Sequence, residues 1–190
     1  MKAQARLLGI DDAPFAFGDA ETEVVGVVVR APSYVEGAMT TRVAVDGRDA
    51  TARLAAMIGK SRFREVVTLI LIDGAALGGF NVVDIGALHE EVGIPVATVT
   101  RDEPDVVAIE RALRARFPDA DERLAVLRRQ DLVRVATEHK PLYVSCAGMG
   151  PREVADSIKK CTVRGALPEP IRIAHILATA IKKGESHGRA

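Results

Sequence analysis

Two aspartates each end a run of apolar residues, and a pair of carboxylates in that position can hold a divalent metal ion. Asp11 ends the run that begins at Arg6, and Asp73 ends the run that begins at Val66. Such runs are typical of core strands, and open α/β folds place their sites at the carboxyl edge of the sheet. Two carboxylates there would suit phosphoryl chemistry with a divalent ion. The alternative is that each aspartate only begins a loop.

The elements around these aspartates predict an α/β protein. We expect strands at 6–11, 23–30, 38–45, 66–72, 94–100, 133–137 and 142–145, and helices at 49–58, 82–91, 106–116, 121–129, 152–161 and 170–182. Three strands before the first long helix favour an antiparallel meander beside βαβ units. This is the element order of a ribonuclease H-like three-layer fold, with a mixed central sheet and helices on both faces, although other α/β sandwiches also fit. No linker or repeat divides the chain, so we expect a single domain over residues 1–190.

The charge is balanced over the chain but not along it. Lysine plus arginine and aspartate plus glutamate number 26 each, which favours neither binding nor exclusion of nucleic acid. Residues 151–190, however, carry eight basic side chains against four acidic ones. This excess, which includes Lys159, Lys160 and Arg172, is either a phosphate-binding surface or a solvated helix face.

The same composition bears on the cellular compartment. No segment approaches the roughly 18 apolar residues of a membrane span, and the first six residues lack the apolar stretch of a signal peptide. Cys146 and Cys161 are expected to be free buried thiols. These features predict a cytoplasmic protein without a membrane partner.

Several segments resemble endonuclease V, a nuclease that nicks DNA or RNA near deaminated bases. The resemblance is carried above all by Leu167-Pro168-Glu169-Pro170 within residues 164–175. Segments 9–11 and 72–74 resemble the two acidic strands of that family, 34–37 its strand-separating wedge, and 143–145 a late strand.

Over essentially its whole length, the chain is identified as a member of an archaeal family of small proteins called endonuclease dU, which is related to endonuclease V. Residues 11–15, 78–81 and 184–190 resemble that family in detail. The resemblance implies a metal-dependent endonuclease that cuts nucleic acid containing a deaminated base such as deoxyuridine, in DNA repair. DNA is the expected partner, with RNA as the alternative, and Mg²⁺ or Mn²⁺ is the expected cofactor.

The resemblance also assigns roles to individual residues. Asp11 and Asp73 match the metal-binding aspartates, and His175 matches a catalytic position near the metal. A lone histidine on an apolar helix is also often a satisfied core residue. Arg101 stands where endonuclease V has a phosphate-facing lysine. Tyr34 matches the wedge beside an everted base, with capping of the core as the alternative.

The chain departs from the endonuclease V pattern at three places. Val43 stands at the position of a third catalytic glutamate, Gly79 at about that of a histidine, and Glu36 at the proline of the wedge. Asp12, Glu36 and Asp46 are candidate substitutes for the missing acid. Loss of one ligand of three leaves a second hypothesis, a weakly active or inactive protein that keeps the nuclease fold and binds nucleic acid or nucleotides.

Overall fold

A single mixed sheet forms the centre of the computed structural model, which describes residues 4–16 and 18–186. Its strands run in the order β3-β2-β1-β4-β7-β9-β8. Their bounds are β1 Arg6–Asp12, β2 Glu21–Arg30, β3 Tyr34–Ala44, β4 Val67–Asp73, β7 Val96–Thr100, β8 Val133–Val135 and β9 Leu142–Ala147. The central strands β1, β4 and β7 are parallel, and the flanking pairs are antiparallel. The predicted mixed sheet, with its meander at one side, is confirmed.

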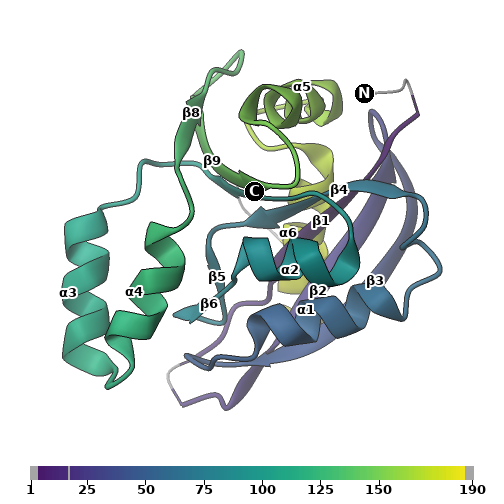
Figure 1. The fold of residues 1–190 in the computed structure, drawn as a ribbon. Coiled ribbons are helices and arrows are strands. Elements are labelled where there is room, and N and C mark those ends of the chain that lie inside the picture. Colours follow the sequence, from purple (N-terminus) through teal and green to yellow (C-terminus); the bar gives the residue numbers. More distant parts are fainter. Residues whose placement is uncertain (1–3, 17, 187–190) are drawn as a thin grey trace.

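Helices cover both faces of this sheet (Figure 1). They are α1 Ala50–Gly59, α2 Ile85–Val92, α3 Val106–Arg116, α4 Ala120–Arg128, α5 Pro151–Cys161 and α6 Glu169–Lys183. In the view of Figure 1, α1 and α2 lie in front of the sheet, α6 lies behind it, and the α3–α4 hairpin stands to the left. No helix within the described residues is long and apolar enough to cross a membrane.

Alternation of side chains along the central strands decides which face each aspartate occupies. On β4, Ile72 packs into the core on the α1 and α2 side, and Leu71 packs into the core that includes residues of α5 and α6. Because successive side chains point to opposite faces, Asp73 shares the face of Leu71. The same alternation on β1 puts Asp11 on this face. Both carboxylates therefore lie on the face that α6 covers.

Glycine at position 9 allows α6 to cross β1 at very short range. A Cβ atom placed on Gly9 would lie 2.1 Å from the carbonyl carbon of Pro170, a distance that real Cβ atoms do not show. Pro170 is near the start of α6, where proline fits the first turn. The close crossing fixes where α6 begins on the sheet and brings His175 to Asp11.

The glycine-rich segment after Asp73 forms a small hairpin. β5 Ala76–Leu77 pairs with β6 Asn81–Val82 through Gly78 and Gly79, which both have positive φ. Helix α2 therefore begins at Ile85, with the Asp84 carboxylate accepting the Ala87 N–H as its N-cap, and not at residue 82 as predicted. A helix cannot include residues whose backbone groups already pair in a hairpin.

Candidate active site

Asp11 and Asp73 converge at the carboxyl edge of the sheet. Asp73 is the last residue of β4, and Asp11 is the last residue but one of the neighbouring parallel strand β1. The register pairs Ile10 with Ile72. His175 approaches from α6. One ligand atom from each of the three residues lies within 4.8 Å of the others. The carboxylates are thus far closer than the ~8 Å at which one shared ion would be ruled out.

Asp11 is the most deeply placed member of this cluster. Only 5% of it is exposed, and its Oδ2 lies 2.7 Å from His175 Nδ1, so one proton is shared between them. Burial raises the pKa of Asp11 to about 8, and the nearby charges of Asp73 and Asp12 add to the rise. A nearby positive charge would strongly stabilise the ionised form of a carboxyl group in this setting.

Asp73 lies closer to solvent and faces a cation. Arg101, just beyond β7, places its Nη2 3.7 Å from Asp73 Oδ2, and its side chain is 43% exposed. Burial raises the pKa of Asp73, whereas the positive charge of Arg101 opposes that rise. Arg101 thus stands at the mouth of the cluster, where a phosphate could also contact it.

The donor set fits a divalent cation. Metal–oxygen bonds of about 2.0–2.6 Å allow donors up to roughly 5 Å apart to share one ion, and the three donors meet this limit. Carboxylate oxygens suit Mg²⁺ and Mn²⁺, and an imidazole is compatible with Mn²⁺. A dication would also offset the mutual repulsion of the two neighbouring carboxylates.

The three candidate substitute acids have partners elsewhere. The Asp12 carboxylate accepts the Gly78 N–H at 2.8 Å, and Asp46 accepts the Phe80 N–H at 2.9 Å while also pairing with Arg116. Both acids therefore fasten the β5–β6 hairpin. Neither belongs to the donor cluster found among residues 4–16 and 18–186.

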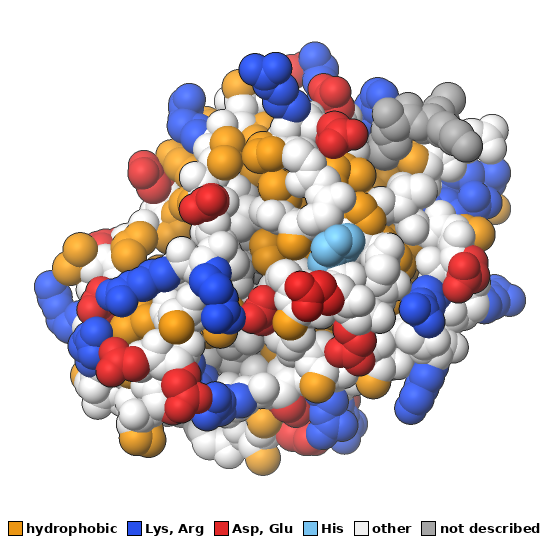
Figure 2. Space-filling model, in the orientation of Figure 1, with side chains coloured by type: hydrophobic (Ala, Val, Ile, Leu, Met, Phe, Trp, Pro, Cys, Tyr) orange, Lys and Arg blue, Asp and Glu red, His pale blue; other side chains and the backbone are white. Residues whose placement is uncertain are grey.

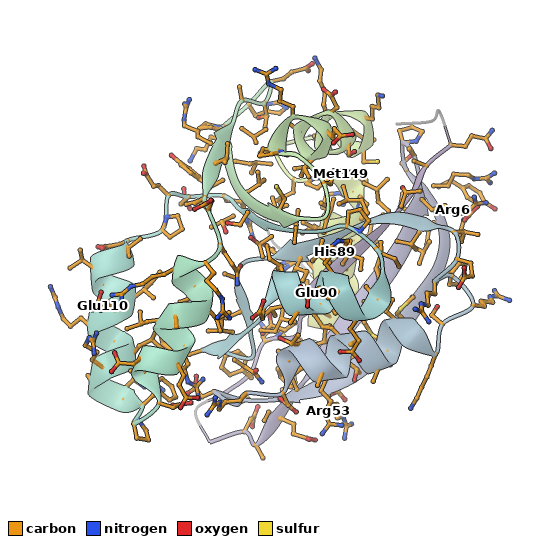
Figure 3. The ribbon with its side chains drawn as sticks, in the orientation of Figure 1. Arg6, Arg53, His89, Glu90, Glu110 and Met149 are labelled. Carbon is orange, nitrogen blue, oxygen red and sulfur yellow. The ribbon has the colours of Figure 1, made fainter. Side chains whose placement is uncertain are left out.

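Glu36, the third of these acids, lies at the other end of the sheet. It forms ion pairs with Arg6, at the start of β1, and with Arg30. Figure 3 labels Arg6 at the right-hand edge of the molecule. Asp11 is five residues further along β1, about 17 Å away at 3.3 Å per residue.

The register of β3 clarifies the missing third acid. Asp11 pairs with Val25, and Val25 pairs with Thr40, so Thr40 is the β3 residue level with Asp11 and on the same face. Val43 is fully buried in the core on the opposite face. An acid at position 43 would point away from the cluster, whereas one at position 40 would share its face.

Tyr34 is presented to solvent, as predicted for a wedge. It is the first residue of β3 and 62% exposed, with the Arg30 guanidinium 4.8 Å from the centre of its ring. The chain turns at residues 31–33, so Tyr34 directly follows the turn between β2 and β3. Tyr34 pairs with Arg30 at the amino edge of β1, at the far end of the sheet from Asp11.

The predicted basic residues differ in their surroundings. Arg172 forms two hydrogen bonds with the buried Glu169 carboxylate, at 2.9 and 2.6 Å. Lys159 and Lys160 are exposed in the last turn of α5. The structure brings Arg101 to the acidic cluster but places Arg172 in an ion pair that fastens the start of α6.

Two features of the site were not predicted from the sequence. One is the crossing of α6 over Gly9, for which a glycine inside an apolar strand is the available signal. The other is an apolar cavity beside Gly74. Its residues come from well-separated segments, so no local pattern reveals it.

The chain is similar to known proteins over nearly its whole length. The sequence model of the endonuclease dU family matches residues 3–182. A UPF0215 protein of Methanothermobacter thermautotrophicus is 41% identical, over 100% of this chain and 94% of its own length. The resemblance at residues 184–190 extends past the described residues, since 187–190 lie outside them.

Solved structures share the fold. The crystal structure of a protein of unknown function from Archaeoglobus fulgidus is 37% identical with a TM-score of 0.85, covering 94% of this chain and 98% of that one. Endonuclease V of Ciona intestinalis, in complex with a DNA that contains an inosine, has a TM-score of 0.55 at 17% identity, covering 90% of this chain and 82% of that one. The second likeness shows that the fold is ribonuclease H-like, as predicted.

Proposed function

This chain belongs to the endonuclease dU family, and we propose that it is a divalent-metal-dependent endonuclease that hydrolyses phosphodiester bonds beside a deaminated base. The observation that carries this proposal is the convergence of Asp11, Asp73 and His175 within 4.8 Å at the carboxyl edge of the sheet. DNA is the proposed substrate, because the endonuclease V of similar fold was crystallised with a DNA containing an inosine, and inosine carries a deaminated adenine.

Asp11 and Asp73 are the proposed metal ligands, with His175 beside them. A bound Mg²⁺ or Mn²⁺ would supply positive charge that stabilises the additional negative charge on a phosphodiester under attack. The carboxylates are held in place before a metal or substrate binds, because they lie on the sheet strands β1 and β4. The Asp12 N–H also donates to Asp11 Oδ1 at 2.9 Å. Such preorganisation avoids rearrangement during the reaction.

His175 and Arg101 have proposed roles in the same reaction. Hydrolysis adds water across a P–O bond and yields a phosphate monoester and a hydroxyl group, so a proton must leave the water. The His175–Asp11 pair can hold a proton at Nδ1, and a third of the histidine side chain remains accessible. Arg101 can contact a phosphate oxygen with its exposed guanidinium.

One observation favours a second candidate function. Thr40 occupies the place level with Asp11 on β3 where a third acid could have joined the cluster. A site with two carboxylates carries less negative charge than a site with three, and it therefore binds a divalent metal ion less tightly. The second candidate is therefore a protein that binds the same nucleic acids without cutting them.

A cleavage assay separates the two candidates. Purified protein with Mn²⁺ or Mg²⁺ is incubated with oligonucleotides that carry uracil, hypoxanthine or no damage. We expect metal-dependent cutting beside the deaminated base, and a loss of at least ~100-fold for Asp73→Asn, since the ligand charge is removed. Glu90→Gln, at an exposed position on α2 (Figure 3), is the matched control and should cut normally. Binding without cutting by the wild type would favour the second candidate.

A further inference from the structure

A pocket of about 310 Å³ lies between the β8–β9 turn and the end of α5. Figure 1 shows these elements side by side at the top of the molecule. The volume is at the lower end of the range for small-molecule sites in proteins, about 300–1,000 Å³. The pocket is therefore large enough for one nucleobase.

The pocket lies on the same face of the sheet as the acidic cluster. Val135 and Ile158 line it, and both belong to the core that also contains Leu71. Leu71 and Asp73 lie on one face of β4, because side chains alternate along a strand. The pocket and the two metal-site carboxylates are therefore open to the same side of the molecule.

The pocket also lies at the same edge of the sheet. Strand β9 is antiparallel to β7, and its residue Tyr143 pairs with Thr100, the last residue of β7. The next pair, Leu142 with Val135, thus lies beyond the end of β7. The turn at residues 136–141 extends further in this direction, past the carboxyl edge at which Asp73 ends β4.

The strand order sets the distance between the pocket and the cluster. Strands β7 and β9 separate β4 from β8, so β8 lies three strand spacings from Asp73, about 14 Å. Arg101 directly follows β7 and lies between the two places. A stacked nucleic-acid strand advances about 3.4 Å per nucleotide, so roughly four nucleotides span this distance.

The walls combine a ring, a cation and an apolar floor. His139 and Lys159 line the pocket and are exposed, and Val135, Ala155 and Ile158 are among its apolar members. Lys159 has no ion-pair partner among the described residues. An imidazole ring can stack on the face of a base, and an ammonium group can bind the phosphate attached to it.

The hydroxyl groups of the pocket are already used within the protein. Thr137 Oγ1 donates to the Lys140 carbonyl oxygen at 2.7 Å, and Thr162 Oγ1 donates to the Ile158 carbonyl oxygen at 2.8 Å. Neither hydroxyl is therefore a free donor for the edge of a base. A pocket of this kind binds a base by its faces and tolerates any base.

We propose that the substrate strand leaves the metal site along the carboxyl edge, passes Arg101, and places an undamaged, unpaired base in this pocket against His139. The phosphate of that nucleotide binds Lys159. This inference rests on the proposed function, since the strand is the one that the metal site would cut. The pocket holds the strand at a second point and does not select the lesion.

A single tryptophan tests whether a base enters the pocket. The chain contains no tryptophan, so His139→Trp introduces one there and keeps a ring that can stack. Short oligothymidine is added in EDTA, which prevents metal-dependent cutting, and tryptophan emission is measured. Stacking of a base should lower the emission about twofold or more at saturation. A strand of abasic residues of equal length has no bases and should leave it almost unchanged.

Val107→Trp is the control for this measurement. Val107 is 68% exposed on α3 and does not line the pocket, so its emission should change little with either strand.

Affinities of two further variants separate the base from the phosphate. Fluorescence anisotropy measures the binding of labelled oligothymidine and of the labelled abasic strand at low salt. His139→Ala should weaken binding of oligothymidine about fivefold or more and leave the abasic strand unchanged, because only the stacking contact is lost. Lys159→Gln should weaken both strands about equally. Both side chains are exposed, so neither substitution should prevent folding.

The outcomes separate this inference from the proposed function. Unchanged emission of His139→Trp with bound oligothymidine, equal losses for the two strands in His139→Ala, or no binding of oligothymidine would overturn the pocket proposal. Each would do so even if the wild type cuts uracil-containing DNA with Mn²⁺. Lowered emission with oligothymidine but not with the abasic strand would support the pocket even if no cleavage is found, in which case the endonuclease proposal alone fails.

Discussion

Asp11 combines deep burial with four charged or titrating neighbours at close range. Asp73 and Asp12 disfavour its ionised form, His175 shares a proton with it, and Arg101 acts against the rise in pKa. In the folded, metal-free protein its pKa is about 8, compared with 3.8 for an unperturbed aspartate. The folded state therefore binds this proton more tightly than the unfolded state does.

We expect the metal-free protein to lose stability as pH rises from about 4 to about 8. Asp11 contributes fully to the free energy of unfolding below its pKa in the unfolded state. This contribution is lost as pH rises through its pKa in the folded state, because the folded protein must then keep a buried charge. Urea denaturation in EDTA at pH 5 and pH 8.5 measures the effect. Asp11→Asn should flatten the dependence, and Glu90→Gln should not. A wild type that is equally stable at both pH values would contradict the assignment.

The residues of the cluster differ in how far the sequence could identify them. Asp11 and Asp73 come at the ends of apolar runs, and these strand ends were enough to predict that both lie at the carboxyl edge of the sheet. His175 required the family resemblance, because a histidine on an apolar helix has no local signature. The ion pairs of Glu36 and Asp46 depend on long-range packing, and for this reason sequence alone could not show where these acids lie.

At the scale of elements, the crossing of α6 over β1 determines whether the site exists. Leu167-Pro168-Glu169-Pro170 starts α6, and the Glu169 carboxylate accepts from Arg172 within the first turn. The sequence predicted a helix start there, which the structure confirms within one residue. It could not predict that the start lies directly on Gly9, because that contact joins segments about 160 positions apart.

Gly9→Ala should therefore damage both stability and the site. The added methyl group would overlap the Pro170 backbone, so α6 must move, and overpacking of this kind costs about 1–3 kcal/mol or more. Gly59→Ala is the matched control, because nothing lies within 4 Å of a Cβ atom there. Urea denaturation measures the loss, and the NMR chemical shifts of the His175 ring measure its displacement from Asp11. A Gly9→Ala protein as stable as Gly59→Ala would refute the crossing.

At the scale of the whole molecule, charge is mixed over the visible surface. Figure 2 shows Lys and Arg side chains interspersed with Asp and Glu over the α3 and α4 side. No single-sign field on this face would steer a nucleic acid. Binding is then expected to depend on local groups of basic residues, of which the end of α5 is the candidate predicted from the sequence.

Replacing Lys159 and Lys160 with alanine should weaken binding about equally for all sequences. Each phosphate contact that is lost lowers the slope of log affinity against log salt by about 0.7–0.9, so a decrease of about 1–2 is expected. Arg53→Ala with Lys60→Ala removes the same charge from α1 and the residue that follows it, on the other face of the sheet, and should change little. Equal salt slopes for the two double variants would show that the α5 lysines form only a solvated helix face.

The separation of Tyr34 from the metal ligands sets the size of the substrate that both could contact. Five residues of β1 separate their levels on the sheet, about 17 Å, and a strand of DNA advances about 3.4 Å per nucleotide. A duplex that contacts both ends of the sheet must therefore extend about five base pairs from the cut. A wedge at Tyr34 would act on the duplex at that distance and not on the scissile bond.

Tyr34→Ala should thus reduce cleavage of long duplexes about tenfold or more, because stacking on an aromatic ring offsets part of the cost of unpairing. Single strands, and duplexes that end within about three base pairs of the lesion on the Tyr34 side, should be cut almost as by the wild type. Tyr34→Phe keeps the ring and should retain activity on all substrates. Since the side chain is 62% exposed, the melting temperature should change little. An equal loss on duplex and single strand would instead assign Tyr34 a role in packing the amino edge of the sheet.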